Sequence, residues 1–268
     1  MFDSVYISCM KPLVLIALFF ALFLNIVSAQ QRNEKQIEQD LLKSFKKIYD
    51  CKVAITNHRG EDIIVGLYDT LTKANDSFKQ KLISYTAKYP STIKDPFNSL
   101  TKEGMFIVTS FDYRFRIYSW DTETGGTAHD FNNVVQFKDG NKTYVTSLEP
   151  GYFYTKATVL KAAGGPYYLV VYNGIESTKD MVEGIQVLGL KNSKVDSIPL
   201  IKTATGLHNE LSYEYDYFSL NAKVKDADIH YNPMAKTITL PVVLDKGRVT
   251  NNRITYKFNG QYFERVKS

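Results

Sequence analysis

Apolar residues in the N-terminal part of the chain recur every three or four positions, which is the period of an α-helix. Residues 34–49 place them on one helical face with lysines turned outward, and residues 72–89 repeat the pattern until Pro90 ends it. Between these helices, residues 53–56 and 62–67 predict a short pair of strands. The sequence therefore predicts a small α-helical cap within residues 30–100.

From Met105 onward, short runs alternate apolar and polar residues. Pairs such as Asp139-Gly140 and Asn259-Gly260 separate these runs and favour tight hairpins, because they reach positive φ at low cost. Strands are predicted over residues 105–110, 115–120, 127–137, 143–148, 152–160, 167–172, 184–190, 196–201, 213–220, 237–244, 253–258 and 261–266. Consecutive strands joined by tight turns run antiparallel, so residues 101–268 are predicted to form an antiparallel β domain, a meander packed with the cap as one unit.

The predicted strands fall into three groups of roughly four, over residues 105–148, 152–201 and 213–266. One β-propeller blade has this size, so the predicted fold is mainly β with propeller-like four-stranded units and an N-terminal helical cap. A β-sandwich, in which antiparallel sheets pack face to face, is the alternative that the same strands allow.

Residues 1–29 have the pattern of a signal peptide. A lysine precedes an almost wholly apolar run over residues 12–27, and small residues follow it. Asn25 interrupts the run and polar sequence follows at once, which favours cleavage over a permanent membrane anchor. We therefore expect a secreted or periplasmic protein that does not span the membrane after cleavage. The sequence leaves open whether translation starts at Met1 or Met10.

Composition narrows the classes of partner. The chain has 33 Lys and Arg against 28 Asp and Glu, a net charge of +5, and no basic cluster alternates with aromatic residues, so nucleic acid is not expected. Cys9 falls in the signal peptide, which leaves Cys51 alone and allows no internal disulfide. Cys51 is expected to be inert. The 19 Tyr and 16 Phe fit a strand-rich chain.

The stretch FRIYSWDTETGGTAHDF, residues 115–131, is the most distinctive in the chain. Its segment IYSWDTETGGT, with YTAKYPSTI upstream and YKFNGQYFERV near the C-terminus, resembles a family of exported bacterial proteins that has no established activity. The string WDTETG is also similar to a hairpin turn of β-propeller blades, in which the acid and the glycine shape the turn. The family resemblance implies export and a compact fold, and it implies no catalytic residue.

Five residues of this stretch form the candidate binding site. Alternation along a strand puts Arg116, Tyr118 and Trp120 on one face, and Asp121 and His129 follow. An exposed tryptophan beside an acid and an imidazole could stack on a sugar ring. In the alternative interpretation, Trp120 fills the core and Asp121 shapes the turn.

If the protein is an enzyme, Asp112, Asp121 and His129 are its catalytic candidates, because such groups exchange protons near neutral pH. Paired carboxylates for glycoside hydrolysis could also come from Glu123 and Glu149. The sequence contains no G-x-S-x-G, no H-E-x-x-H and no phosphate-binding glycine loop, which are the local signatures of several enzyme classes.

Two segments carry metal-ligand residue types. Asp226, Asp228 and His230 alternate and would share one side of an extended segment, and His208-x-Glu210 is the nearest second pair. The first segment is flanked by lysines and has the composition of a loop. No metal and no cofactor are therefore predicted.

These features together predict an exported, non-catalytic binding or interaction protein of the cell envelope, whose partner is a glycan or a protein. The alternative is a secreted hydrolase that acts through two carboxylates near residues 115–131. The sequence indicates neither the ligand, nor the oligomeric state, nor the biological process.

Overall fold

The computed structural model describes residues 35–58, 61–149, 151–220, 224 and 228–266. The chain divides into two compact units, Met1–Asp40 and Leu41–Ser268, and in the first unit only residues 35–40 are described, as part of a helix. The predicted signal peptide lies outside the described residues. Within the described residues, no helix is long and apolar enough to cross a membrane.

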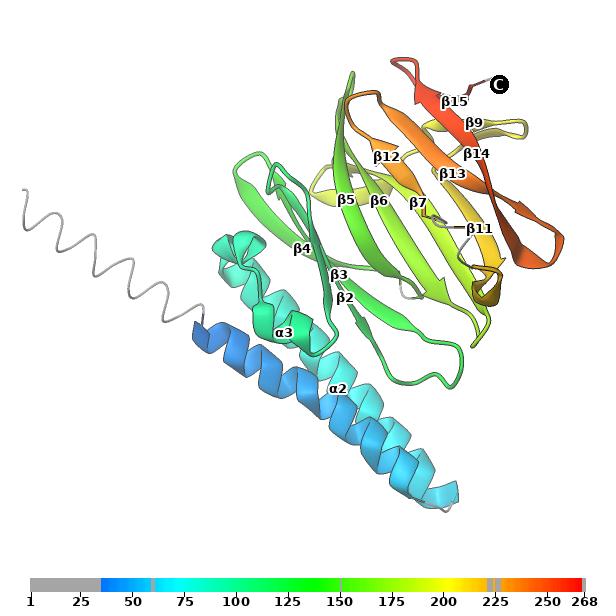
Figure 1. Ribbon diagram of the computed structural model, residues 1–268. Helices are drawn as coiled ribbons and strands as arrows, with labels where there is room; N and C mark the ends of the chain where they lie inside the picture. Colours follow the sequence, from blue (N-terminus) through cyan, green and yellow to red (C-terminus); the bar gives the residue numbers. More distant parts are fainter. Residues whose placement is uncertain (1–34, 59–60, 150, 221–223, 225–227, 267–268) are drawn as a thin grey trace, which may run out of the picture. The chain divides into compact units, whose positions relative to one another are not determined.

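The chain is mainly β, with a small helical part at its N-terminal end (Figure 1). The helices are residues 35–57, α2 (Glu61–Lys88), the 3-10 turn η1 (Pro90–Lys94) and α3 (Asn98–Lys102). The strands are β1 (Phe106–Thr109), β2 (Phe115–Asp121), β3 (Phe131–Asp139), β4 (Lys142–Leu148), β5 (Phe153–Ala162), β6 (Gly165–Ile175), β7 (Asp180–Lys191), β8 (Lys194–Ser197), β9 (Ile201–Thr203), β10 (Gly206–His208), β11 (Glu210–Asp216), β12 (His230–Asn232), β13 (Thr237–Leu244), β14 (Arg248–Phe258) and β15 (Phe263–Arg265). Apart from the parallel pair of β9 and β15, described neighbours pair antiparallel, which confirms the predicted fold class.

The predicted strand pair over residues 53–56 and 62–67 is wrong, because both segments are helical. Partly buried residues at Cys51, Lys52 and Ile55 continue the helical period begun by Ile48. The β-branched residues in this segment lower helix propensity only by a few tenths of a kcal/mol each, roughly, so packing of the helical face decides the outcome.

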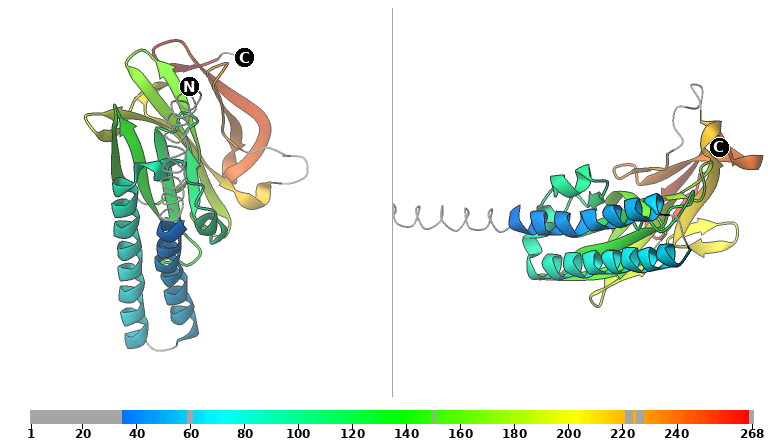
Figure 2. Two further views of the ribbon diagram at one scale, coloured as in Figure 1. Left: turned by 90° about the vertical axis from the view of Figure 1, so that its left-hand side faces the viewer. Right: turned by 90° about the horizontal axis from the view of Figure 1, so that it is seen from below.

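Residues 41–57 and α2 lie side by side, as both views of Figure 2 show. The rings of Phe45 and Phe78 meet between them with centroids 5.0 Å apart. The buried side chains of Leu71, Phe78 and Leu82 follow a helical period along α2, which gives that helix an apolar face for packing.

Strands β1 to β4 form a four-stranded sheet in sequence order, which we call the helix-side sheet. In β2, every residue from Phe115 to Trp120 is buried, so both faces of this strand are covered. Phe115 and Ile117 belong to the core shared with the next sheet, whereas Trp120 contacts Phe78 of α2. The alternation predicted for residues 115–120 is therefore confirmed.

The next layer is a central sheet in the order β11-β7-β6-β5, with β8 paired to β7. Its β6 strand is buried on both faces: Tyr168, Val170 and Tyr172 belong to the core shared with the helix-side sheet, and Leu169 and Val171 to the opposite core. Because side chains alternate along a strand, one strand contributes to two separate cores.

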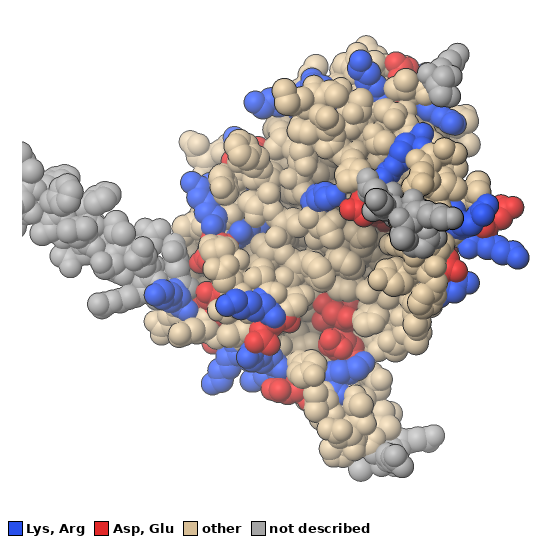
Figure 3. Space-filling model, viewed as in Figure 1, with Lys and Arg blue, Asp and Glu red and all other residues tan. Residues whose placement is uncertain are grey.

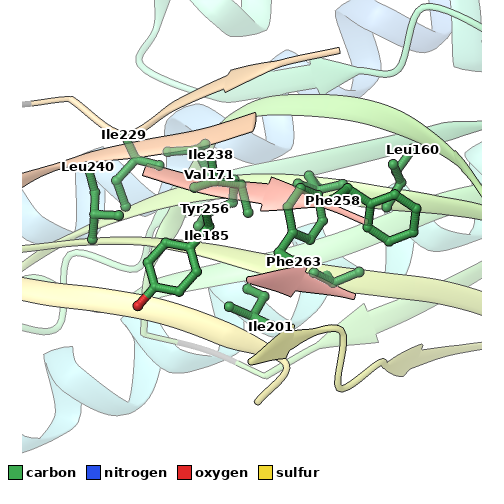
Figure 4. Close-up of a cluster of buried hydrophobic side chains, with 12 residues drawn as sticks. Leu160, Val171, Ile185, Ile201, Ile229, Ile238, Leu240, Tyr256, Phe258 and Phe263 are labelled. Atoms are coloured by element: carbon green, nitrogen blue, oxygen red, sulfur yellow. The ribbon is translucent and has the colours of Figure 1, made fainter. Parts of the chain in front are cut away.

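The opposite core lies between the central sheet and an outer sheet in the order β10-β9-β15-β14-β13-β12. Figure 4 shows its side chains converging from both layers, with Val171 and Ile185 from the central sheet and Ile238 and Phe263 from the outer one. The sheets thus stack face to face, as in the predicted alternative. The propeller-like arrangement is not confirmed, because the sheets differ in strand number and β11 pairs with β7 rather than with the strands that follow it.

Trp120, the only tryptophan, is fully buried, and its indole Nε1 donates to Asn75 Oδ1 at 3.0 Å. We expect the native protein to show blue-shifted tryptophan emission that resists quenching by iodide and acrylamide, because water cannot reach the ring. Emission that is red-shifted and readily quenched before denaturation would contradict this position of Trp120.

Candidate functional site

Three of the five predicted binding residues lie in the interior, where they attach the helical part to the sheet. The Arg116 guanidinium donates to the carbonyl oxygens of Thr92 and Asp95, both at 2.6 Å, and its Nε donates to Thr109 Oγ1 at 2.7 Å. Arg116 thereby fixes η1 and the segment after it on the edge of β1 and β2.

Tyr118 and Trp120 complete this internal attachment. The hydroxyl of Tyr118 donates to Gln136 Oε1 at 2.8 Å, and burial raises the pKa of Tyr118 to about 12. Trp120 packs edge to face against Phe78, with ring centroids 5.0 Å apart. These positions agree with the core interpretation of Trp120. They leave neither the two rings nor the Arg116 guanidinium on a surface that a ligand could reach.

Asp121 and His129, by contrast, meet at the partly exposed end of β2. Asp121 Oδ1 accepts from the backbone N–H of Glu123 at 2.7 Å, and its Oδ2 lies 2.5 Å from His129 Nδ1. Glu123 has a φ of 59°, so the Asp121 carboxylate stabilises a left-handed turn residue, as the turn interpretation of Asp121 requires. The same carboxylate orients the imidazole and leaves Nε2 as the nitrogen available for proton transfer.

A cavity of about 640 Å³ lies beside this turn, and Asp121 and Glu123 line it. Its other lining residues come from residues 45–50 and 102–104: Phe45, Lys46, Ile48, Tyr49, Asp50, Lys102, Glu103 and Gly104. Burial, followed by the charge of Asp121, raises the pKa of Glu123. Figure 3 shows acidic and basic side chains gathered together in the lower part of the face it draws, over the helical part of the chain.

The enzyme candidates do not form one constellation. Asp112 lies in the turn before β2, where its carboxylate accepts from Ser110 Oγ at 2.5 Å and from the Tyr168 hydroxyl at 3.3 Å. Asp121 is the last residue of β2. The two carboxylates therefore lie at opposite ends of this strand, which is about 20 Å long. Of the hydrolytic candidates, the structure therefore groups Asp121 with Glu123 and His129 and separates Asp112 from them.

The two metal-ligand segments give no assembled site. Asp226 lies outside the described residues. His208 Nε2 lies 2.9 Å from Thr205 Oγ1 on an exposed hairpin. Among the residues that the structure describes, no group of three or more His, Cys, Asp or Glu side chains could hold a metal ion.

A second cavity, of about 440 Å³, opens on the face of the central sheet, and we call it the tyrosine cleft. Its described lining residues come from the segment before β5 and from four strands of the central sheet: Glu149, Tyr152, Tyr154, Tyr172, Val182, Gln186, Glu210, Ser212, Tyr213 and Glu214. The helix-side sheet packs chiefly against β5, so it leaves the β7 and β11 end of this face open. The cleft is thus a consequence of how the two sheets are offset.

Stacked aromatic rings form one side of the tyrosine cleft. The rings of Tyr152 and Tyr172 lie 4.9 Å apart at an interplanar angle of 6°, and Tyr154 meets Tyr172 edge to face. Two glycines make room for them: a Cβ on Gly174 would lie 2.5 Å from the Tyr152 ring, and one on Gly184 would lie 2.1 Å from Tyr172 Cζ. The rings can approach the strands this closely only because these strand positions have no side chain.

Carboxylates form the other side of the tyrosine cleft. Glu210, Ser212 and Glu214 alternate along β11, and Glu210 Oε2 accepts from the Tyr172 hydroxyl at 3.4 Å. Burial and the charge of Glu210 raise the pKa of Tyr172, so its hydroxyl stays protonated and able to donate. Among the described lining residues none is Lys or Arg, which makes the cleft an acidic site with aromatic faces.

The sequence pattern singled out neither Tyr152 nor Tyr172 as a site residue, and it named Glu210 only beside His208 as a possible metal-ligand pair. The usable signal was the pair of glycines inside otherwise regular strands, Gly174 and Gly184, which often marks a close approach of another group. Comparison with known proteins adds no candidate, because no family, no curated protein and no solved structure matches this chain. The geometry of the two cavities therefore carries the functional argument.

Proposed function

We propose that the protein is an exported, non-catalytic glycan-binding protein of the cell envelope, and that its ligand occupies the tyrosine cleft. The observation that carries this proposal is the stacked pair Tyr152 and Tyr172 beside Glu210 and Glu214. Aromatic faces stack on the apolar faces of sugar rings, and carboxylates accept hydrogen bonds from sugar hydroxyls. The pattern of residues 1–29 and the resemblance to exported proteins support export.

The size and position of the cleft support the same proposal. A volume of about 440 Å³ lies within the range of small-ligand sites, which are usually preformed and contain few, well-placed polar groups. Tyr172 is buried and its ring contacts those of Tyr152 and Tyr154, so this ring is rigid before any ligand arrives. A rigid ring loses little entropy on binding, which favours affinity.

Tyr152→Ala is expected to weaken glycan binding roughly 5- to 30-fold, because a ring stacked on a sugar contributes roughly 1–2 kcal/mol. The measurement is a glycan array with the purified protein, followed by titration calorimetry on the best ligand. Tyr262→Ala is the matched control, since Tyr262 lies in a turn between β14 and β15 of the outer sheet. Unchanged affinity in Tyr152→Ala, with the fold intact by circular dichroism, contradicts the proposed site.

A second candidate function is a secreted hydrolase at the cavity beside Asp121. Its support is that Asp121 and Glu123 share that cavity while burial and the Asp121 charge raise the pKa of Glu123, which is how a general acid and an ionised partner are set apart. Hydrolysis assays on polysaccharides and peptides should accompany the array. Turnover that is lost in Asp121→Asn, with folding unchanged, would replace the binding assignment with this one.

A further inference from the structure

The charge of the tyrosine cleft narrows the class of glycan. Three carboxylates, those of Glu149, Glu210 and Glu214, line a cavity whose described residues include no basic side chain. Glu176 lies close enough that its charge, with those of Glu210 and Glu214, raises the pKa of Tyr152 after burial does. Like charges gathered at one site repel an anionic ligand and attract a cationic one.

Resting on the proposed function, we propose that the tyrosine cleft binds glycans that carry free, protonated amino groups, such as oligomers of 2-amino-2-deoxyhexose, in preference to neutral and anionic glycans. Each part of such a ligand meets a matching group. The sugar face stacks on the Tyr152 ring, and the ammonium lies among Glu149, Glu210 and Glu214. An ammonium near the ring gains further attraction from its negative face.

The neutral polar groups of the cleft fit the hydroxyls of the same ligand. Ser212 and Gln186 line it and can both donate and accept hydrogen bonds. Burial and neighbouring glutamates raise the pKa of the tyrosines at the site, to about 12 for Tyr154, so their hydroxyls stay neutral through the physiological range. A site for a plain cation would need no such donors. The combination of carboxylates with neutral hydrogen-bond donors therefore favours an amino sugar over a simple amine or a lysine side chain.

The experiment compares two matched oligomers that differ only at the amino group, with an anionic oligomer beside them. Titration calorimetry is run at mildly acidic pH, where the amines are protonated, with a glucosamine hexamer, its N-acetylated counterpart and a hexuronic acid oligomer. We expect the free-amine hexamer to bind at least 10-fold more tightly than the N-acetylated one, and the uronic acid oligomer to show no binding. Raising the salt concentration should reduce the preference, because partly exposed charges are screened.

Glu210→Gln tests the residue that the inference names. It should reduce the preference for the free-amine hexamer several-fold while affinity for the N-acetylated hexamer changes less, since only the charge is lost. Glu264→Gln is the control, because Glu264 is exposed on β15 of the outer sheet. An undiminished preference in Glu210→Gln would place the discrimination elsewhere and overturn the inference.

The remaining outcomes distinguish failure of the amine preference from failure of glycan binding itself. Equal affinity for the free-amine and N-acetylated hexamers, with loss in Tyr152→Ala, overturns the amine preference and keeps a glycan-binding cleft. Failure of every glycan overturns both. Tight binding of an oligolysine peptide without any glycan binding also overturns both and identifies the cleft as a receptor for basic peptides.

Discussion

Trp120→Ala is expected to lower the free energy of unfolding by about 3–5 kcal/mol, because it removes the largest buried side chain and leaves a cavity. The substitution ends the edge-to-face contact with Phe78 and leaves the side-chain oxygen of Asn75 without its donor. Asn75 also donates to Thr122 O at 2.8 Å, so the loss extends to the start of the turn that holds Asp121. Helices and sheet should therefore separate at lower denaturant concentration.

Denaturation in urea, followed by far-ultraviolet circular dichroism, measures this loss for Trp120→Ala. For a chain of this size, about 3 kcal/mol corresponds to a fall in Tm of roughly 6 °C or more. Trp120→Phe should lose less, since a ring is kept while the hydrogen bond is not. Phe111→Ala is the matched surface control, because Phe111 is 95% exposed. A loss in Trp120→Ala no larger than in Phe111→Ala would show that the helical part is not held by this residue.

The periodicity of the sequence was enough to predict which residues share each face of β2. It was not enough to predict that other parts of the protein cover both faces. Alternation over residues 115–120 correctly separated the Phe115 face from the Trp120 face, because a strand has a period of two whatever its surroundings. It could not reveal that both faces are buried, since Arg116 and Ser119 resemble surface residues. Arg116 is buried because backbone carbonyls of η1 and its neighbour satisfy its guanidinium, a long-range arrangement that no local pattern records.

The sequence grouped candidate residues that contact one another only where those residues are close along the chain. Asp121 and His129 are eight residues apart in one hairpin, and they do meet. The tyrosine cleft escaped prediction because its members come from the segment before β5, from β6 and from β11, and β11 pairs with β7 although three strands, β8 to β10, lie between them in the sequence. Only pairing between distant strands brings Tyr152, Tyr172 and Glu210 together, and strand order is not encoded in alternation.

Gly184→Ala is expected to destabilise the protein by about 1–3 kcal/mol and to remove glycan binding, although it adds a single methyl group. The new Cβ would lie 2.1 Å from Tyr172 Cζ and 2.3 Å from its hydroxyl oxygen. Gly184 pairs with Tyr172 on one side and with Ser212 on the other, so β7 cannot shift away. The Tyr172 ring cannot swing aside either, because Tyr152 stacks on it and Tyr154 abuts its edge.

A double-mutant cycle with Tyr172→Ala tests this cause of the Gly184→Ala effect. Without the Tyr172 ring the new methyl group has space, so the double variant should be more stable than the sum of the two single losses predicts. Gly66→Ala is the control, since a Cβ there meets no atom within 4 Å and alanine favours the helix. Additive losses would mean that Gly184 acts through backbone conformation instead. Because Tyr172 supports the Tyr152 ring, non-additive stability combined with lost binding would tie the packing of the central sheet directly to the proposed glycan-binding surface.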